Sequence, residues 1–106
     1  MARYLIRVSY TSDGVQGLLK EGGSGRRAMV EGMVGDLGGT LEAFYFAFGT
    51  DDAYVIAELP DHETAAAVSL TVTAAGSART SVVVLLTPEE VDAATKKTVG
   101  YRAPGR

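Results

Sequence analysis

The sequence predicts an α+β fold in which helices lie on one face of a four-stranded antiparallel sheet. Four segments have strand character, and helical segments separate the first from the second and the third from the fourth. The second and third are joined by a short turn, which is typical of a β-hairpin. A chain of 106 residues has room for a single domain with one modest core.

The first strand is expected over residues 3–10, where side chains alternate between two faces. Tyr4 and Tyr10 are expected at the edge of the core with their hydroxyls reaching solvent. A short helical turn follows over residues 15–20 and is interrupted by glycines. Ser24 is then the expected cap of a longer helix, which ends at a pair of glycines before residue 40.

The second and third strands are expected over residues 40–48 and 53–59. A four-residue turn between them predicts a pairing that begins with Phe48 opposite Ala53, and a shift of this pairing by one residue would reverse the two faces. The other face of this hairpin then carries Tyr45, Tyr54, Ile56 and Glu58. The three phenylalanines of the second strand are expected in the core, under the helices: Phe44, Phe46 and Phe48.

Asp61 is the expected cap of a helix that ends at Gly76, although the β-branched run VSLTVT within it disfavours helix. A strand follows over residues 79–87. The segment Thr87-Pro88-Glu89-Glu90 then has the sequence of a helix start: a cap, a proline at the first helical position and a glutamate three residues after the cap. This last helix is expected to run to Lys97.

The order of elements is strand, helix, strand, strand, helix, strand, helix. Two βαβ halves with right-handed crossovers place the first and third strands in the centre and the second and fourth at the edges, which is the ferredoxin-like arrangement. We expect one domain over residues 1–97 and a loose tail over residues 98–106.

The face of the sheet without helices is expected to be apolar, because Leu5, Tyr45, Tyr54 and Ile56 fall on it together with part of the last strand. Such a patch is unusual on a monomer. A second copy packed sheet to sheet around a twofold axis is the expected cover. The alternative cover is the chain's own last helix, which offers Val91 and Ala94.

The chain resembles the GYD-domain family over roughly residues 1–97. Three segments carry the resemblance: RYLIRVSYTSDGVQGL, LGGTLEAFYFAFGTDDAYVIAELPD and ARTSVVVLLTPEE. The family's Gly-Tyr-Asp signature at the central hairpin corresponds here to Gly49-Thr50-Asp51-Asp52, with Asp51 where the tyrosine is expected. The resemblance implies ferredoxin-like units of the dimeric α/β-barrel type, and it implies no particular reaction.

Composition excludes several classes of function. The absence of cysteine excludes disulfides, thiol catalysis, zinc–thiolate sites and iron–sulfur clusters, and one histidine leaves little for a histidine-based metal site. A net charge of −3 with scattered basic residues disfavours a nucleic-acid partner. The start MARYLIRVSY does not resemble a signal peptide, and the longest apolar run, Val82–Leu86, is too short to cross a bilayer. We expect a cytoplasmic homo-oligomer with no cofactor, metal, nucleic-acid or membrane partner.

The candidate ligand-binding residues are Arg7, Tyr45, Tyr54 and Glu58, all expected on the helix-free face. A guanidinium and a carboxylate between two aromatic walls could position a polar ligand between two sheets. Burial would raise the pKa of the carboxyl group, and a nearby arginine would lower it. The alternative is an interface ion pair that fixes the register of a dimer.

Three other motifs have simpler interpretations. Asp51 and Asp52 could help to bind a divalent cation, but aspartates are also common in turns. The glycine-rich segment 22–29 could hold an anion at a helix start, but it lacks the P-loop ending and is expected to be a connector. His62 is expected to be an exposed residue in the first turn of its helix.

Two hypotheses of function follow. The first is a non-enzymatic, homo-oligomeric binding or assembly module that pairs through its helix-free sheet face, because no catalytic constellation is present. The second is a cofactor-independent enzyme of the dimeric α/β-barrel type, which would act on a small molecule such as an aromatic compound in a cavity between the sheets. Analogy of fold is the main support for the second.

Overall fold

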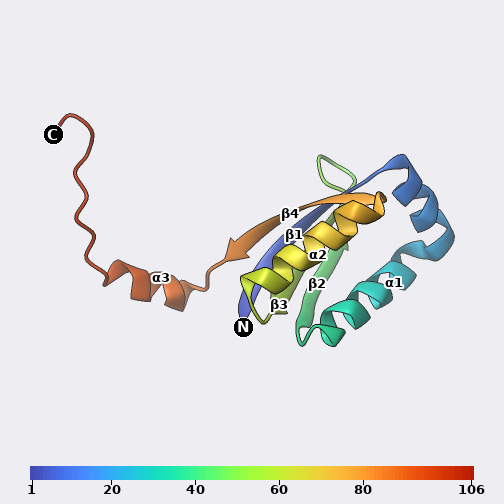
Figure 1. Cartoon of the computed structure of the whole chain (residues 1–106), viewed down its shortest axis with the longest axis horizontal. Coiled ribbons are helices and arrows are strands. Elements are labelled where there is room, and N and C mark those ends of the chain that lie inside the picture. Colours follow the sequence, from blue (N-terminus) through green and yellow to red (C-terminus); the bar gives the residue numbers. More distant parts are fainter.

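The computed structural model describes residues 1–106, and its elements follow the predicted order (Figure 1). They are β1 (Ala2–Tyr10), α1 (Ser12–Asp36), β2 (Thr40–Phe46), β3 (Ala53–Leu59), α2 (His62–Ala75), β4 (Ala78–Leu85) and α3 (Pro88–Thr95). The strands form one antiparallel sheet in the order β2-β3-β1-β4, so β1 and β3 are central as predicted. The predicted ferredoxin-like α+β arrangement is confirmed.

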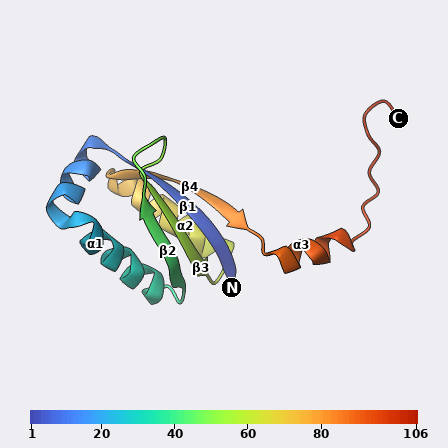
Figure 2. The same ribbon diagram turned by 180° about the vertical axis from the view of Figure 1, so that it is seen from behind.

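Both long helices lie on one face of the sheet, and the view from behind shows the strands in front of α2 (Figures 1 and 2). The core between these layers is built from alternate residues of the two central strands and one residue from each helix. Its buried cluster consists of Tyr4, Ile6, Val34, Val55, Ala57, Leu59 and Ala65. A fully buried aliphatic side chain in such a cluster stabilises the fold by about 1.5–3 kcal/mol.

Glycine divides α1 as the sequence predicts, but the details differ. The helix begins at Ser12, where the Thr11 side chain accepts a hydrogen bond from the Gly14 backbone N–H at 3.2 Å. The break lies at Gly22, whose φ of 81° is in the left-handed region that glycine adopts without strain. Ser24 lies inside the second half of the helix, so its predicted role as the cap is wrong.

Local chemistry sets both ends of α2. The Asp61 carboxylate accepts a hydrogen bond from the Thr64 backbone N–H at 2.8 Å, and Gly76 ends the helix with a φ of 83°. The β-branched run VSLTVT is helical despite its weak propensity. Two residues of the helix, Ala65 and Val68, are buried. This burial outweighs differences in helix propensity of a few tenths of a kcal/mol per residue.

The predicted register of the β2–β3 hairpin is wrong by two residues. Phe46, not Phe48, lies opposite Ala53, and the connection is longer than four residues. Phe48 has a φ of 56°, so the chain leaves the extended conformation before it. Asp52 is held by β1 instead, since its N–H donates to the Val8 carbonyl at 2.8 Å.

A shift of two residues preserves the faces, so the assignment of the hairpin to two sides of the sheet is correct. Phe44 and Phe46 are half-buried on the helix side. Phe48 is 63% exposed and stacks on Phe46, with ring centroids 5.7 Å apart, so its predicted place in the core is wrong.

Beyond β4, the chain leaves the body of the domain. All eight residues of α3 are exposed, and the helix and the residues after it project away from the sheet (Figures 1 and 2). The radius of gyration is 16.9 Å, compared with about 13 Å for a compact domain of this length. The chain's own last helix therefore does not cover the helix-free face, and it ends at Thr95 rather than Lys97.

We predict that Gly39→Ala destabilises the fold by about 1–3 kcal/mol, because an added methyl group overpacks this site. The new Cβ would overlap the backbone carbonyl oxygen of Glu58 and lie 3.0 Å from Leu59 Cδ2. Urea denaturation measures the change in the free energy of unfolding.

The matched control is Gly32→Ala in the second half of α1, where an added Cβ meets open space. Alanine favours helix over glycine by about 0.5–1 kcal/mol, so this variant should be slightly more stable than the parent. Equal effects of the two substitutions would contradict the close packing at Gly39.

Candidate functional site

The helix-free face of the sheet, called the open face below, is apolar across its full width. Directly opposed positions place Ala43 beside Ile56, Ile56 beside Leu5, and Leu5 beside Val83. These four residues, one from each strand, form the apolar row. A sheet with one solvated face normally alternates apolar-in and polar-out, so the outward apolar row departs from that pattern.

A second row, the tyrosine row, crosses the same four strands on one side of the apolar row. It consists of Tyr45, Tyr54, Arg7 and Ser81, which are paired in that order. Tyr45 is 71% exposed, and Arg7 Nη2 donates to Ser81 Oγ at 3.1 Å. The row therefore presents two phenol rings beside one guanidinium.

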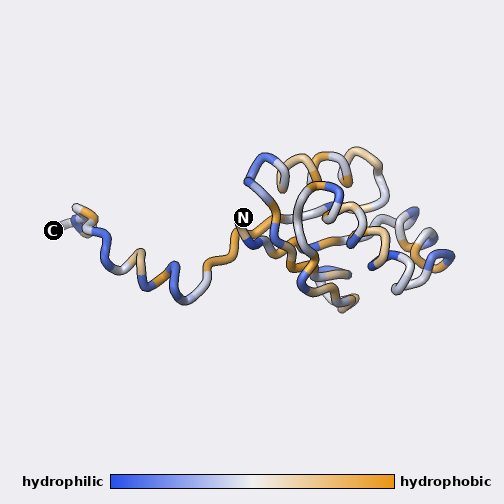
Figure 3. The backbone as a smooth tube through the Cα atoms, turned by 90° about the horizontal axis from the view of Figure 1, so that it is seen from below, coloured by the Kyte–Doolittle hydropathy of each residue, from blue (hydrophilic) through white to orange (hydrophobic).

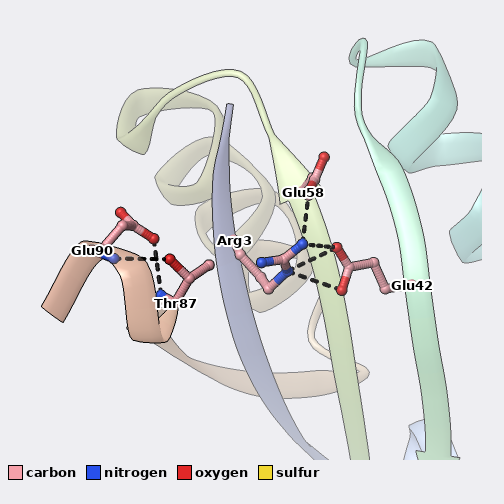
Figure 4. A network of polar contacts seen from close by, with 5 residues as sticks. All are labelled: Arg3, Glu42, Glu58, Thr87 and Glu90. Carbon is pink, nitrogen blue, oxygen red and sulfur yellow. Dashed lines mark hydrogen bonds and ion pairs between the residues drawn. The ribbon is translucent and has the colours of Figure 1, made fainter. Parts of the chain in front are cut away.

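An ionic cluster of Arg3, Glu42 and Glu58 lies on the other side of the apolar row (Figure 4). Arg3 Nε donates to both carboxylate oxygens of Glu42, at 2.8 and 2.9 Å, and Arg3 Nη2 donates to Glu58 Oε1 at 2.9 Å. Each side chain is about one-third exposed. One guanidinium faces two carboxylates, so the cluster has a net charge of −1.

A β-bulge brings Glu42 to this cluster. Leu41 lies opposite Ala57 and Ala43 opposite Ile56, so Glu42 is an extra residue on β2 with no partner on β3. The hydrogen bonds from Arg3, together with its charge, hold the pKa of Glu42 below its usual range. Glu42 in turn raises the pKa of Arg3.

The structure brings together three of the four predicted ligand residues. Arg7, Tyr45 and Tyr54 share the tyrosine row, whereas Glu58 lies four residues further along β3 and pairs with Arg3. Within one chain, Arg7 and Glu58 therefore do not form the expected pair of charges. Alternation alone puts both arginines of β1 on the open face, and only the strand register decides which one meets Glu58.

A second polar contact joins Tyr4 to His62 on the helix side of the sheet. The Tyr4 side chain is 1% exposed, and its hydroxyl hydrogen-bonds His62 Nδ1 at 2.6 Å, so the prediction that this hydroxyl reaches solvent is wrong. Burial raises the pKa of Tyr4, and the charges of Asp61 and Glu63 add to the increase. His62 is exposed, as predicted, and also lines a cavity of about 320 Å³ beside the ionic cluster.

The remaining candidate motifs have structural partners. Asp52 Oδ2 accepts a hydrogen bond from the Tyr10 N–H at 2.8 Å, and Asp51 Oδ1 accepts one from Ser9 Oγ at 3.3 Å. No group of three or more histidine, aspartate or glutamate side chains is arranged to hold a metal ion. None of the helices has both the length and the apolar character required to cross a membrane.

Comparison with protein families gives a match to the GYD-domain model over residues 4–95, most of the chain. The chain belongs to the GYD-domain family. Searches of curated proteins and of solved structures gave no match. In this GYD domain, Asp51 lies in the hairpin connection against β1.

We predict that Glu42→Gln reduces the acid sensitivity of the fold. The folded pKa of Glu42 lies below its unfolded value of about 4.3, so its ion pair stabilises the fold above that pH. This contribution is lost as pH falls through the lower, folded pKa. Urea denaturation between pH 6 and pH 3 should therefore show a shallower loss of stability in the variant.

The control is Glu31→Gln on α1, an exposed residue without an ion pair. Its pH profile should follow that of the parent. Parallel profiles for the parent and Glu42→Gln would mean that the ionic cluster contributes nothing to stability.

Proposed function

We propose that this GYD domain is a homo-oligomeric assembly module that pairs with a second copy of itself, open face to open face. The observation that carries the proposal is the apolar row, which crosses all four strands and has no helix above it. Contiguous apolar surface of this kind marks interaction sites in soluble proteins. A twofold pairing is the simplest cover, because each copy then covers the other's row.

The polar rows on either side favour a definite orientation of the two copies. A twofold axis that runs across the strands reverses the strand direction, so it places the tyrosine row of one copy over the ionic cluster of the other. Arg7 would then face a cluster of net charge −1. Complementary charges at the rim of an apolar contact fix its register.

We predict that Ile56→Glu dissociates the assembly. Ile56 lies between Ala43 and Leu5 in the apolar row, and a carboxylate there would be buried without a partner. We expect the dissociation constant to rise at least about 100-fold, which corresponds to about 2.7 kcal/mol. Sedimentation velocity over a dilution series measures it, and circular dichroism checks that the variant is folded.

The matched control is Leu70→Glu on α2, where the leucine is 72% exposed and away from the open face. It introduces the same charge and should leave the assembly unchanged. If both variants, or neither, dissociate the protein, the open face is not the pairing surface.

The second candidate function is a cofactor-independent enzyme whose site lies between the two sheets. The tyrosine row favours it, because two phenol rings beside Arg7 suit an aromatic anion. In the orientation above, Glu58 of the partner subunit would complete the predicted set. The probes are benzoate and hydroxybenzoates in a thermal-shift assay.

A rise in melting temperature that Arg7→Ala abolishes would support a ligand site in the dimer. No shift with any of these aromatic acids would leave the assembly module as the function of this face.

A further inference from the structure

We propose that residues 86–106, called the arm below, pack on a second copy of the chain. The arm comprises the two residues that follow β4, then α3, and then residues 96–106. This inference rests on the proposed pairing and deepens it, because it adds a second contact between the same two copies.

The arm begins in a fixed direction. Thr87 and Glu90 form a reciprocal capping box: the Glu90 N–H donates to Thr87 Oγ1 at 3.1 Å, and the Thr87 N–H donates to Glu90 Oε1 at 2.9 Å (Figure 4). These bonds hold the pKa of Glu90 below its usual range. Pro88 adds a preset φ at the first helical position. The helix start is therefore well defined, although α3 lies away from the sheet.

The arm makes no side-chain hydrogen bond or ion pair with residues 1–85, and only its start lies near the body, where Leu86 and Glu90 line the cavity beside the ionic cluster. An isolated helix shorter than about 12–15 residues is marginal in water, and α3 has eight residues, all of them exposed. Apolar stretches recur along the arm (Figure 3). Its large apolar side chains are 47–78% exposed: Leu86, Val91, Val99 and Tyr101. A surface that buries these residues would stabilise the helix.

Charge favours another copy of the body as that surface. Residues 96–106 contain four basic side chains and no acidic one. The whole arm also includes three acidic residues of α3 and has a net charge of +1, whereas residues 1–85 contain six basic against ten acidic side chains, a net charge of −4. No basic residue of the arm has an ion pair in the chain. The basic end of the arm, residues 96–106, and an acidic body attract one another, and β4 directs the arm away from its own sheet (Figure 1).

The area of the open face also points to a second contact. Four strands about 4.8 Å apart and seven residues of about 3.4 Å each give roughly 450 Å² of flat area. A standard stable interface buries about 800 Å² on each partner. The flat area is smaller than the accessible surface that the sheet could bury, and two arms, each lying on the opposite copy, would enlarge the interface further.

The test places a photo-crosslinker at the end of the arm in the full chain, as Tyr101→p-benzoylphenylalanine. Unlabelled and ¹⁵N-labelled chains are mixed, allowed to exchange, irradiated and digested. We expect crosslinked peptide pairs in which one peptide is unlabelled and the other is ¹⁵N-labelled. Their fraction of all crosslinks should match random mixing of the two kinds of chain. Their yield should fall several-fold between low salt and 0.5 M salt, because charge contributes to the contact.

Crosslinks confined to a single chain, or to co-purified nucleic acid or lipid, would overturn the proposal, as would the absence of any crosslink. The same crosslinker at Leu19, exposed on α1, is the control for random collisions. Loss of the mixed crosslink in an Ile56→Glu background is expected if sheet pairing brings the arm to its partner. A dimer without mixed crosslinks contradicts the arm contact alone, whereas a monomeric parent contradicts the pairing as well.

Discussion

The structure depends on a central sheet that carries apolar residues on both faces. Within β1, Tyr4 and Ile6 are buried against the helices, while Leu5 lies between them in sequence and points to the open face. The chain has two long helices, and the crossovers place both on the same side. One face is thereby covered within the chain, and burial of the other requires a second molecule. The proposed assembly follows from this asymmetry.

Much of the fold could be predicted from local patterns. Alternation assigned the residues of β1 and β3 to the correct faces, and the caps at Asp61 and Thr87 were visible as short motifs with a direct hydrogen-bonding role. The hairpin register could not be predicted in this way, because the backbone of Phe48 turns to a positive φ and lengthens the connection. The error of two residues left the faces intact.

The candidate site was less accessible from sequence, because it depends on contacts between distant residues. Arg3 meets Glu58 through the register of β1 and β3, and Glu42 joins them through a bulge with no local sequence signal. The contact between Tyr4 and His62 likewise depends on how α2 lies over the sheet. Membership of the GYD-domain family agrees with the predicted fold, and the orientation of the proposed pairing is inferred from the arrangement of the rows on the open face.

Native mass spectrometry of the full chain at low micromolar concentration, followed by a denaturing run of the same sample, tests whether two copies pair. We expect a species at twice the 11.1 kDa chain mass, or at an even multiple of it, that separates into single chains on denaturation. Extra mass lost in the same step would place a ligand in the assembly. A bare monomer in the native spectrum would contradict the proposed pairing, because the open face would then be stable in water without a cover.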